Sequence, residues 1–239
     1  MRLRKAFSLL SLGTLVGLSV SVLLPATDAG ASCGPHRWVE EYPHITKHAG
    51  TGVGVTAGNG LYLGAINVDC ARVTSVIVFW DVNNQEEIGA IQETTDYFNQ
   101  CPHPPTDSQW YRFWVKVYTG TWSCTSSYAR QGVNTYHEAD IRRDNSNFYS
   151  WHLYWNGSLW TTLTGSKTSG IAMANAERGV STDSIYSEYD GMQYRTTDGA
   201  WHTWGSLLCW LDNDADYDLV TTSSPSHFYV KITNSGYTC

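Results

Sequence analysis

The sequence predicts an all-β fold, an antiparallel β-sandwich of the jelly-roll kind. Helical periodicity is nearly absent, and short runs of alternating apolar and polar residues recur along the chain. Gly, Asn, Asp, Ser and Thr separate these runs, and such residues are typical of turns between strands. The chain also holds 11 Trp and 15 Tyr, and aromatic side chains can fill a β core or line a groove for sugar or peptide.

Residues 1–31 have the pattern of an export signal. They combine a basic start, an apolar run over Leu9–Leu24 and the small-residue cleavage site Ala29-Gly30-Ala31. We therefore expect a secreted, extracellular protein. Residues 32–239 are expected to form a single β-sandwich domain, because that length can bury a sizeable core.

The charge balance restricts the partners that we expect. Without the signal, the 15 basic residues fall to 12 and the 22 acidic residues fall to 21, which leaves a net charge of −9. A negative surface argues against nucleic acid and against anionic membranes, and no later stretch is long and apolar enough to span a bilayer. We expect a monomer whose partner is an extracellular polypeptide or polysaccharide.

All six cysteines follow the signal, and an even number in an exported chain predicts three disulfides. Fifteen pairings are possible. The pair Cys101–Cys124 is favoured because the two residues flank the ends of neighbouring predicted strands. Cys209–Cys239 and Cys33–Cys70 would then tie down the two ends of the domain. No C-x-x-C spacing occurs, which argues against a zinc site.

The first predicted strands lie between residues 53 and 93. Val53–Leu63 is expected to be a strand with a turn at Gly58-Asn59-Gly60. Val73–Val82 is mostly β-branched and aromatic, which is typical of a fully buried strand. Residues 99–109 contain three prolines and are expected to form a loop.

Gln85–Glu93 is predicted to be a strand in the middle of a sheet. Because residues two apart share a face of a strand, Glu87, Gly89, Ile91 and Glu93 should point the same way. Two carboxylates and a glycine on one face suit the floor of a wet groove. A plain exposed sheet face with solvated acids is the alternative.

Tyr111–Tyr118 has the clearest alternation in the chain. Its apolar residues Phe113, Val115 and Val117 are expected to face the core. Trp114 and Tyr118 would then lie on the other face, together with two basic residues. If this strand pairs with Gln85–Glu93, that face would put an aromatic, basic lining beside the carboxylates.

Two further segments follow. His137–Ile141 is a short predicted strand, and the polar residues after it, Arg142–Asn145, are expected to form a turn. Phe148–Thr162 is predicted to be a hairpin, because Asn156-Gly157 between alternating runs favours a tight turn with positive φ at both residues. His152, in its first strand, is expected to line the groove.

Ile171–Gly179 alternates alanines with Met173, Asn175 and Glu177, which predicts a strand that packs closely through its alanine face. A helix is the alternative, since Ala and Met favour it. Flanking glycines bound a segment of strand length. The remaining predicted strands are Ile185–Tyr194, Trp201–Trp210 and His227–Ile232.

Glu87 and Glu177 are the candidate catalytic pair. Two carboxyl groups can perform acid–base chemistry when their surroundings separate their pKa values. Such a pair could cleave a glycosidic bond or activate water against a peptide carbonyl. The candidate substrate-contacting residues are Trp114, Tyr118, His152, Glu93 and Asn175.

The order of these features resembles that of known proteins. Glu87-Ile88-Gly89, the Asn156-Gly157 hairpin and the strand ending Ala176-Glu177 resemble secreted bacterial concanavalin-like β-sandwich proteins and, more distantly, neprosin and other glutamic peptidases. The resemblance covers residues 50–232. It implies that Glu87 and Glu177 are catalytic, with Glu87 activating water and Glu177 acting as the acid or oxyanion partner.

Two other functions are compatible with the residues. Glu87-Ile88 and Glu93 partly match the Glu-Ile-Asp-x-x-Glu motif of sandwich glycoside hydrolases, although Gly89 stands where that motif has aspartate and the spacing is longer. The protein could also be a non-catalytic module that binds carbohydrate or peptide in the same groove.

An acidic run is a candidate site for a cation. Asp212, Asp214 and Asp216 alternate along the chain, and several oxygens on one side could hold Ca²⁺. The EF-hand pattern is not met, because Tyr217 stands at the glycine position and Ser223 at the position of the bidentate glutamate. A solvated acidic loop is therefore the favoured interpretation, and no cofactor is expected.

Overall fold

The computed structural model describes residues 52–64, 71–81, 84–93, 101–102, 104–165, 167–178, 186–205, 217–224 and 226–232, with backbone alone at 81, 93, 177–178, 217–224 and 230–232. All regular structure in these residues is β-strand. Within the described ranges, no helix is long and apolar enough to cross a membrane. The predicted all-β class is confirmed.

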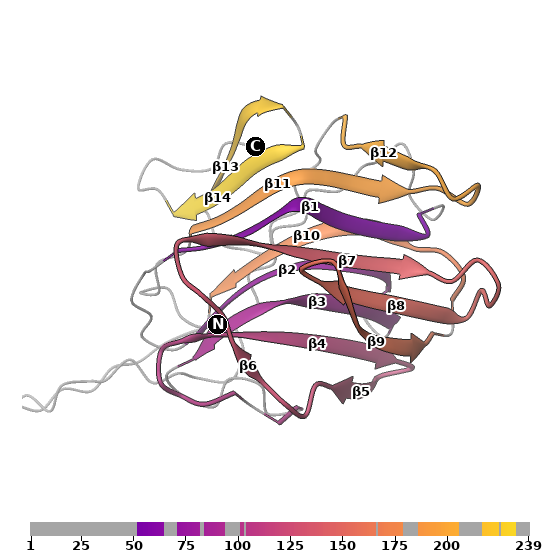
Figure 1. Cartoon of the computed structure of the whole chain (residues 1–239), viewed down its shortest axis with the longest axis horizontal. Helices are drawn as coiled ribbons and strands as arrows, with labels where there is room; N and C mark the ends of the chain where they lie inside the picture. The colour runs from indigo at the N-terminus through magenta and orange to yellow at the C-terminus, as the bar shows by residue number, and fades with distance from the viewer. Residues whose placement is uncertain are drawn as a thin grey trace, which may run out of the picture. The chain divides into compact units, whose positions relative to one another are not determined.

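The strands form two antiparallel sheets that pack as a sandwich (Figure 1). The larger sheet has the order β13-β14-β11-β1-β7-β8-β9, with β12 beside β11. Its strands are β1 (Gly54–Leu63), β7 (Thr135–Arg143), β8 (Ser150–Trp155), β9 (Ser158–Thr164), β11 (Tyr186–Arg195), β12 (Trp201–Thr203), β13 (Tyr217–Ser224) and β14 (His227–Ile232).

The smaller sheet has the order β10-β2-β3-β4-β5, with β6 beside β4. Figure 1 shows β2, β3 and β4 side by side at its centre. Its strands are β2 (Ala71–Asp81), β3 (Asn84–Glu93), β4 (Trp110–Tyr118), β5 (Thr121–Cys124), β6 (Ala129–Arg130) and β10 (Ile171–Arg178).

The main core lies between the two sheets. From the smaller sheet it takes the even-numbered residues of β2, β3 and β10, and from the larger sheet the inward residues of β1, β7, β8 and β11. Ala172, Ala174 and Ala176 all face this core. The alanine face predicted for this strand therefore packs against the opposite sheet, and the strand prediction is confirmed over the helix alternative.

The smaller sheet is buried on its other side as well. We call this side its outer face, meaning the face turned away from the larger sheet. Val73 of β2, Ile91 of β3 and Phe113, Val115 of β4 form a second apolar cluster there, each at most 1% exposed. The predicted burial of Phe113, Val115 and Val117 is confirmed, but the apolar cluster that they join faces away from the larger sheet, and Trp114 packs against the core between the sheets.

Of three turns predicted from the sequence, the structure has one, at Asn156-Gly157. Asn156 and Gly157 have φ angles of 49° and 71° and join β8 to β9, as predicted from the Asn-Gly pair. Gly58-Asn59-Gly60 does not turn the chain, since β1 continues through it with an irregularity in its register. The predicted turn at Arg142 is also wrong, because β7 runs on to Arg143.

A disulfide joins Cys101 to Cys124, as predicted from the ends of neighbouring strands. Cys101 belongs to the apolar cluster on the outer face, and Cys124 is the last residue of β5. The bond therefore fastens the segment before β4 to the edge of the smaller sheet. The predicted pairs Cys209–Cys239 and Cys33–Cys70 and the predicted export signal lie outside the described residues.

Candidate functional site

The candidate site is built on the outer face of the smaller sheet. Glu87 lies in the middle of β3, opposite Ile77 of β2 and Val115 of β4. Asn175 lies on β10, the next strand beyond β2, and pairs with Ser75. Strand pairing thus brings together three segments that are far apart in the sequence.

Ser75 and Asn175 both hydrogen-bond the same oxygen of Glu87. The Ser75 hydroxyl donates to Glu87 Oε1 at 2.5 Å, and Asn175 Nδ2 donates to Oε1 at 3.4 Å. Ser75 and Asn175 are fully buried, and Glu87 is 4% exposed. A buried carboxyl group with two donors on one oxygen has a fixed orientation.

Gly89 makes the approach of Ser75 possible. The two residues are register partners across β2 and β3. A Cβ atom at position 89 would lie 2.4 Å from the Ser75 Cβ and 2.3 Å from the backbone oxygen of Thr74. Any side chain at this position would therefore push β2 away. The glycine two residues after Glu87 opens the space in which Ser75 reaches the carboxyl group.

Burial sets the protonation of Glu87. Removal from water raises its pKa to about 7, and the hydrogen bonds from Ser75 and Asn175 act in the opposite direction. Below neutral pH the group therefore carries a proton. A carboxyl group in this state can donate a hydrogen bond or a proton to a developing oxyanion.

The structure describes only the backbone at the two other predicted acids. Glu177 pairs with Val73 and lies two positions after Asn175 on β10, so both positions belong to the same face of that strand. Glu93 pairs with Ala71 at the end of β3, on the face to which Glu87 also belongs. Strand register thus assigns positions 87, 93, 175 and 177 to one face of the smaller sheet.

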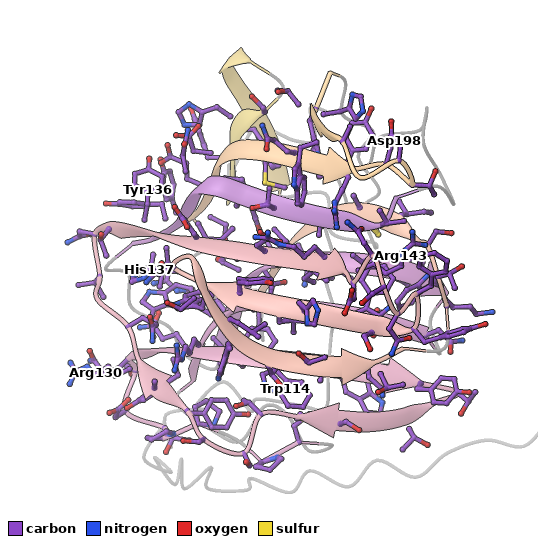
Figure 2. The ribbon with its side chains drawn as sticks, turned by 45° about the vertical axis from the view of Figure 1, so that its right-hand side comes forward. Trp114, Arg130, Tyr136, His137, Arg143 and Asp198 are labelled. Atoms are coloured by element: carbon purple, nitrogen blue, oxygen red, sulfur yellow. A yellow bond between two sulfur atoms is a disulfide. The ribbon has the colours of Figure 1, made fainter. Side chains whose placement is uncertain are left out.

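Trp114 and Tyr118 do not join Glu87. Trp114 pairs with Ile88 and lies on the opposite face of the sheet, against the core (Figure 2). Tyr118 shares the strand parity of Trp114, is 44% exposed, and lies with its ring 5.8 Å from the Lys116 ammonium group. The predicted aromatic, basic lining beside the carboxylates is therefore wrong.

His152 is also distant from the candidate site, because it belongs to the larger sheet. Its neighbours Trp151 and Leu153 face the core, so His152 lies on the outward side of β8. There its Nδ1 meets the Thr162 hydroxyl at 2.8 Å and its Nε2 meets an Asp144 oxygen at 3.3 Å. The predicted role of His152 in the groove of Glu87 is wrong.

Ser75 and Glu86 matter for the surroundings of Glu87 and were not identified from the sequence. Ser75 was hidden in a run predicted simply as a buried strand; the only available signal was that a buried hydroxyl needs a hydrogen-bond partner. Glu86 was passed over although it adjoins Glu87. It points between the sheets, is 1% exposed, and neither of its oxygens has a hydrogen-bond partner among the described residues.

Burial raises the pKa of Glu86 to about 8, against a smaller opposing effect from the Lys116 charge. Glu86 and Glu87 are thus two adjacent acids on opposite faces of one strand. Glu86 faces the main core, and Glu87 faces the hydrogen-bond donors of β2 and β10.

No group of three or more His, Cys, Asp or Glu side chains suitable for a metal ion occurs in the part of the chain that the structure describes. Asp212, Asp214 and Asp216, the candidate Ca²⁺ ligands, lie outside that part.

Two solved structures of peptidases superpose on this chain. A scytalido-glutamic peptidase bound to a transition-state analogue inhibitor superposes with a TM-score of 0.53 and 10% sequence identity, covering 82% of this chain and 98% of that one. SCP-B, a member of the eqolisin family of peptidases bound to the tripeptide Ala-Ile-His, gives a TM-score of 0.54 and 9% identity with the same coverage.

The chain shares the fold of glutamic peptidases. At such low identity the likeness concerns the fold alone, and it agrees with the distant resemblance predicted from the order of the strands. No protein-family model matches the sequence, and no curated protein matches it.

Proposed function

We propose that this chain is an exported glutamic-type peptidase that uses Glu87 and Glu177 as its catalytic pair. The observation that carries the proposal is the buried, doubly hydrogen-bonded carboxyl group of Glu87 on a sheet whose fold is shared with glutamic peptidases. The Cys101–Cys124 disulfide and the export signal predicted at residues 1–31 support an extracellular location.

The raised pKa of Glu87 supports a division of roles within the pair. Glu87 holds its proton until the pH approaches about 7, so in acid it suits the donor role. Glu177 then serves as the base. This reverses the roles that the sequence resemblance implies, because a carboxyl group that stays protonated in acid is a poor base there.

The reaction follows from these roles. Glu177 removes a proton from a water molecule while the water oxygen bonds to the carbonyl carbon of the peptide. Glu87 donates its hydrogen bond, and then its proton, to the carbonyl oxygen as negative charge develops there. The proton on Glu177 then passes to the leaving nitrogen while the hydroxyl made from the carbonyl oxygen returns its proton to Glu87. The C=O bond re-forms as the C–N bond breaks, which releases a carboxylic acid and an amine and restores both glutamates. The substrate class is an extracellular polypeptide.

Two substitutions test this proposal. Glu177→Gln removes the base and should lower the cleavage rate of an unfolded protein in acid by about 10²- to 10⁴-fold. Glu87→Gln keeps a hydrogen-bond donor in a similar shape and should lose roughly tenfold or less. Cleavage is measured as new amino ends released by the purified protein.

Glu86→Gln is the matched control, because Glu86 is the neighbouring buried acid on the opposite face of β3. It should cleave like the unmodified protein. Equal cleavage by all three variants and the unmodified protein would contradict the proposal.

A non-catalytic binding module is the second candidate. The observation that favours it is the small exposure of Glu87, 4%, between the aliphatic residues Ile77 and Val115. A module of this kind would retain a peptide or glycan without cleaving protein at any pH. Retention of such a ligand by an inert preparation would favour this candidate over the peptidase.

A further inference from the structure

We propose that Ser75 is a positioning residue that confines the proton of Glu87 to one carboxyl oxygen, Oε2. This inference rests on the catalytic role proposed for Glu87 and extends it to a residue on a different strand. Ser75 itself touches no substrate in this account. It acts by deciding which oxygen of Glu87 can donate.

The hydrogen bonds of Glu87 carry this argument. A protonated carboxyl group has one O–H donor, and its other oxygen is an acceptor. Oε1 already accepts the Ser75 hydroxyl at 2.5 Å and the Asn175 amide at 3.4 Å. An oxygen that accepts two donors is the carbonyl-like one, so the proton resides on Oε2. That oxygen then offers its O–H to a carbonyl group of the substrate.

The backbone beneath the site is held to the opposite sheet. Thr74, the residue before Ser75, bonds through its hydroxyl to the Ser187 hydroxyl of β11 at 2.5 Å. The Tyr189 hydroxyl, also from β11, donates to the backbone oxygen of Asn175. The two strands that carry the donors to Glu87 are therefore hydrogen-bonded to β11 of the larger sheet, which holds Ser75 and Asn175 in position.

Ser75 makes the shorter of the two hydrogen bonds to Glu87. In the described residues, Glu87 is flanked from β2, β4 and β10 by Ile77, Ser75, Val115 and Asn175, none of which titrates. The other acid assigned to this face of β10 is Glu177. The charged neighbours Glu86 and Lys116 belong to the opposite face of β3 and β4.

The test is Ser75→Ala, with Thr56→Val as the control, because Thr56 is a buried residue of the larger sheet whose hydroxyl donates to the backbone oxygen of Ala139. The Ser75 bond lowers the pKa of Glu87, so its loss should raise that pKa by about one unit, since hydrogen bonds to a charged group are the stronger ones. Infrared titration of the carboxyl group, assigned by subtracting Glu87→Gln, measures the change.

Peptidase kinetics give a second measurement. Because Glu87 acts in its neutral form, the fall of activity at high pH should move upward with the pKa in Ser75→Ala. The kcat should drop by about tenfold while KM changes little, because the donor is misplaced and substrate binding is not. Thr56→Val should leave the titration and the position of the fall unchanged.

An unchanged Glu87 titration in Ser75→Ala would overturn the inference. If that variant does not fold, Ser75→Cys replaces the hydroxyl by a weak donor of similar size and should raise the pKa by less; no rise would again overturn it. The infrared titration needs no enzymatic activity. A protein without peptidase activity but with the predicted titration would therefore refute the proposed function and leave the contact of Ser75 with Glu87 established.

Discussion

Glu86 and Glu87 show how strongly one step along a strand changes the surroundings of a side chain. Both are buried, and burial raises the pKa of both. Glu87 meets two donors, whereas neither oxygen of Glu86 has a hydrogen-bond partner among the described residues. The donors to Glu87 stand 12 and 88 residues away in the sequence, so strand pairing alone reveals them.

Glu86 makes the folded state sensitive to alkali. Its folded pKa of about 8 lies above the ordinary value of 4.5, so the folded chain keeps a proton that the unfolded chain releases. Stability should therefore fall as the pH rises from about 5 to 8, by about 1.4 kcal/mol per pH unit from this residue. Glu87 should add a similar slope up to its pKa of about 7.

Glu86→Gln should remove the part of the pH dependence of stability that comes from Glu86. We expect its free energy of unfolding, measured with urea at a series of pH values, to fall about half as steeply as that of the unmodified protein between pH 5 and 7. It should be nearly flat from pH 7 to 8. Parallel curves for the two proteins would show that Glu86 ionises alike in both states.

At the scale of strands, the register of β2 with β3 determines the site. The sequence predicted β3 and the shared face of Glu87, Gly89 and Ile91 correctly. It also predicted the buried residues of β4, but not that they face away from the larger sheet. Alternation separates two sets of side chains, but the smaller sheet is covered on both faces, so the pattern alone could not tell which set meets the other sheet.

Gly89→Ala tests the close approach of β2 and β3. The added Cβ would lie 2.3 Å from a backbone oxygen of β2, which cannot move without shifting the strand. We expect a loss of roughly 3 kcal/mol in the free energy of unfolding, together with a rise in the pKa of Glu87 as Ser75 is displaced.

The control for this change is Gly205→Ala, because a Cβ at Gly205 would meet no atom within 4 Å. Its free energy of unfolding should stay within about 0.5 kcal/mol of the starting protein. Equal stability of the two variants would mean that β2 and β3 lie farther apart than the structure describes.

At the scale of the whole molecule, the sequence predicted the sandwich because β alternation and turn residues recur along its length. The Asn156-Gly157 hairpin and the Cys101–Cys124 disulfide were predictable from local signals. The grouping of Ser75, Glu87 and Asn175 was not, since it depends on β10 pairing with β2 rather than with a neighbour in sequence. The sequence also did not show that the strand of His152, β8, belongs to the larger sheet.

The central claim is that Glu87 works in its neutral form, and the pH dependence of kcat/KM tests it most directly. In the unmodified protein, activity should fall as the pH rises through about 7, the pKa of Glu87. In Glu87→Gln, whose amide does not titrate, that fall should disappear while activity in acid persists. Activity that instead rises through pH 7 and is abolished at every pH by Glu87→Gln would contradict the claim.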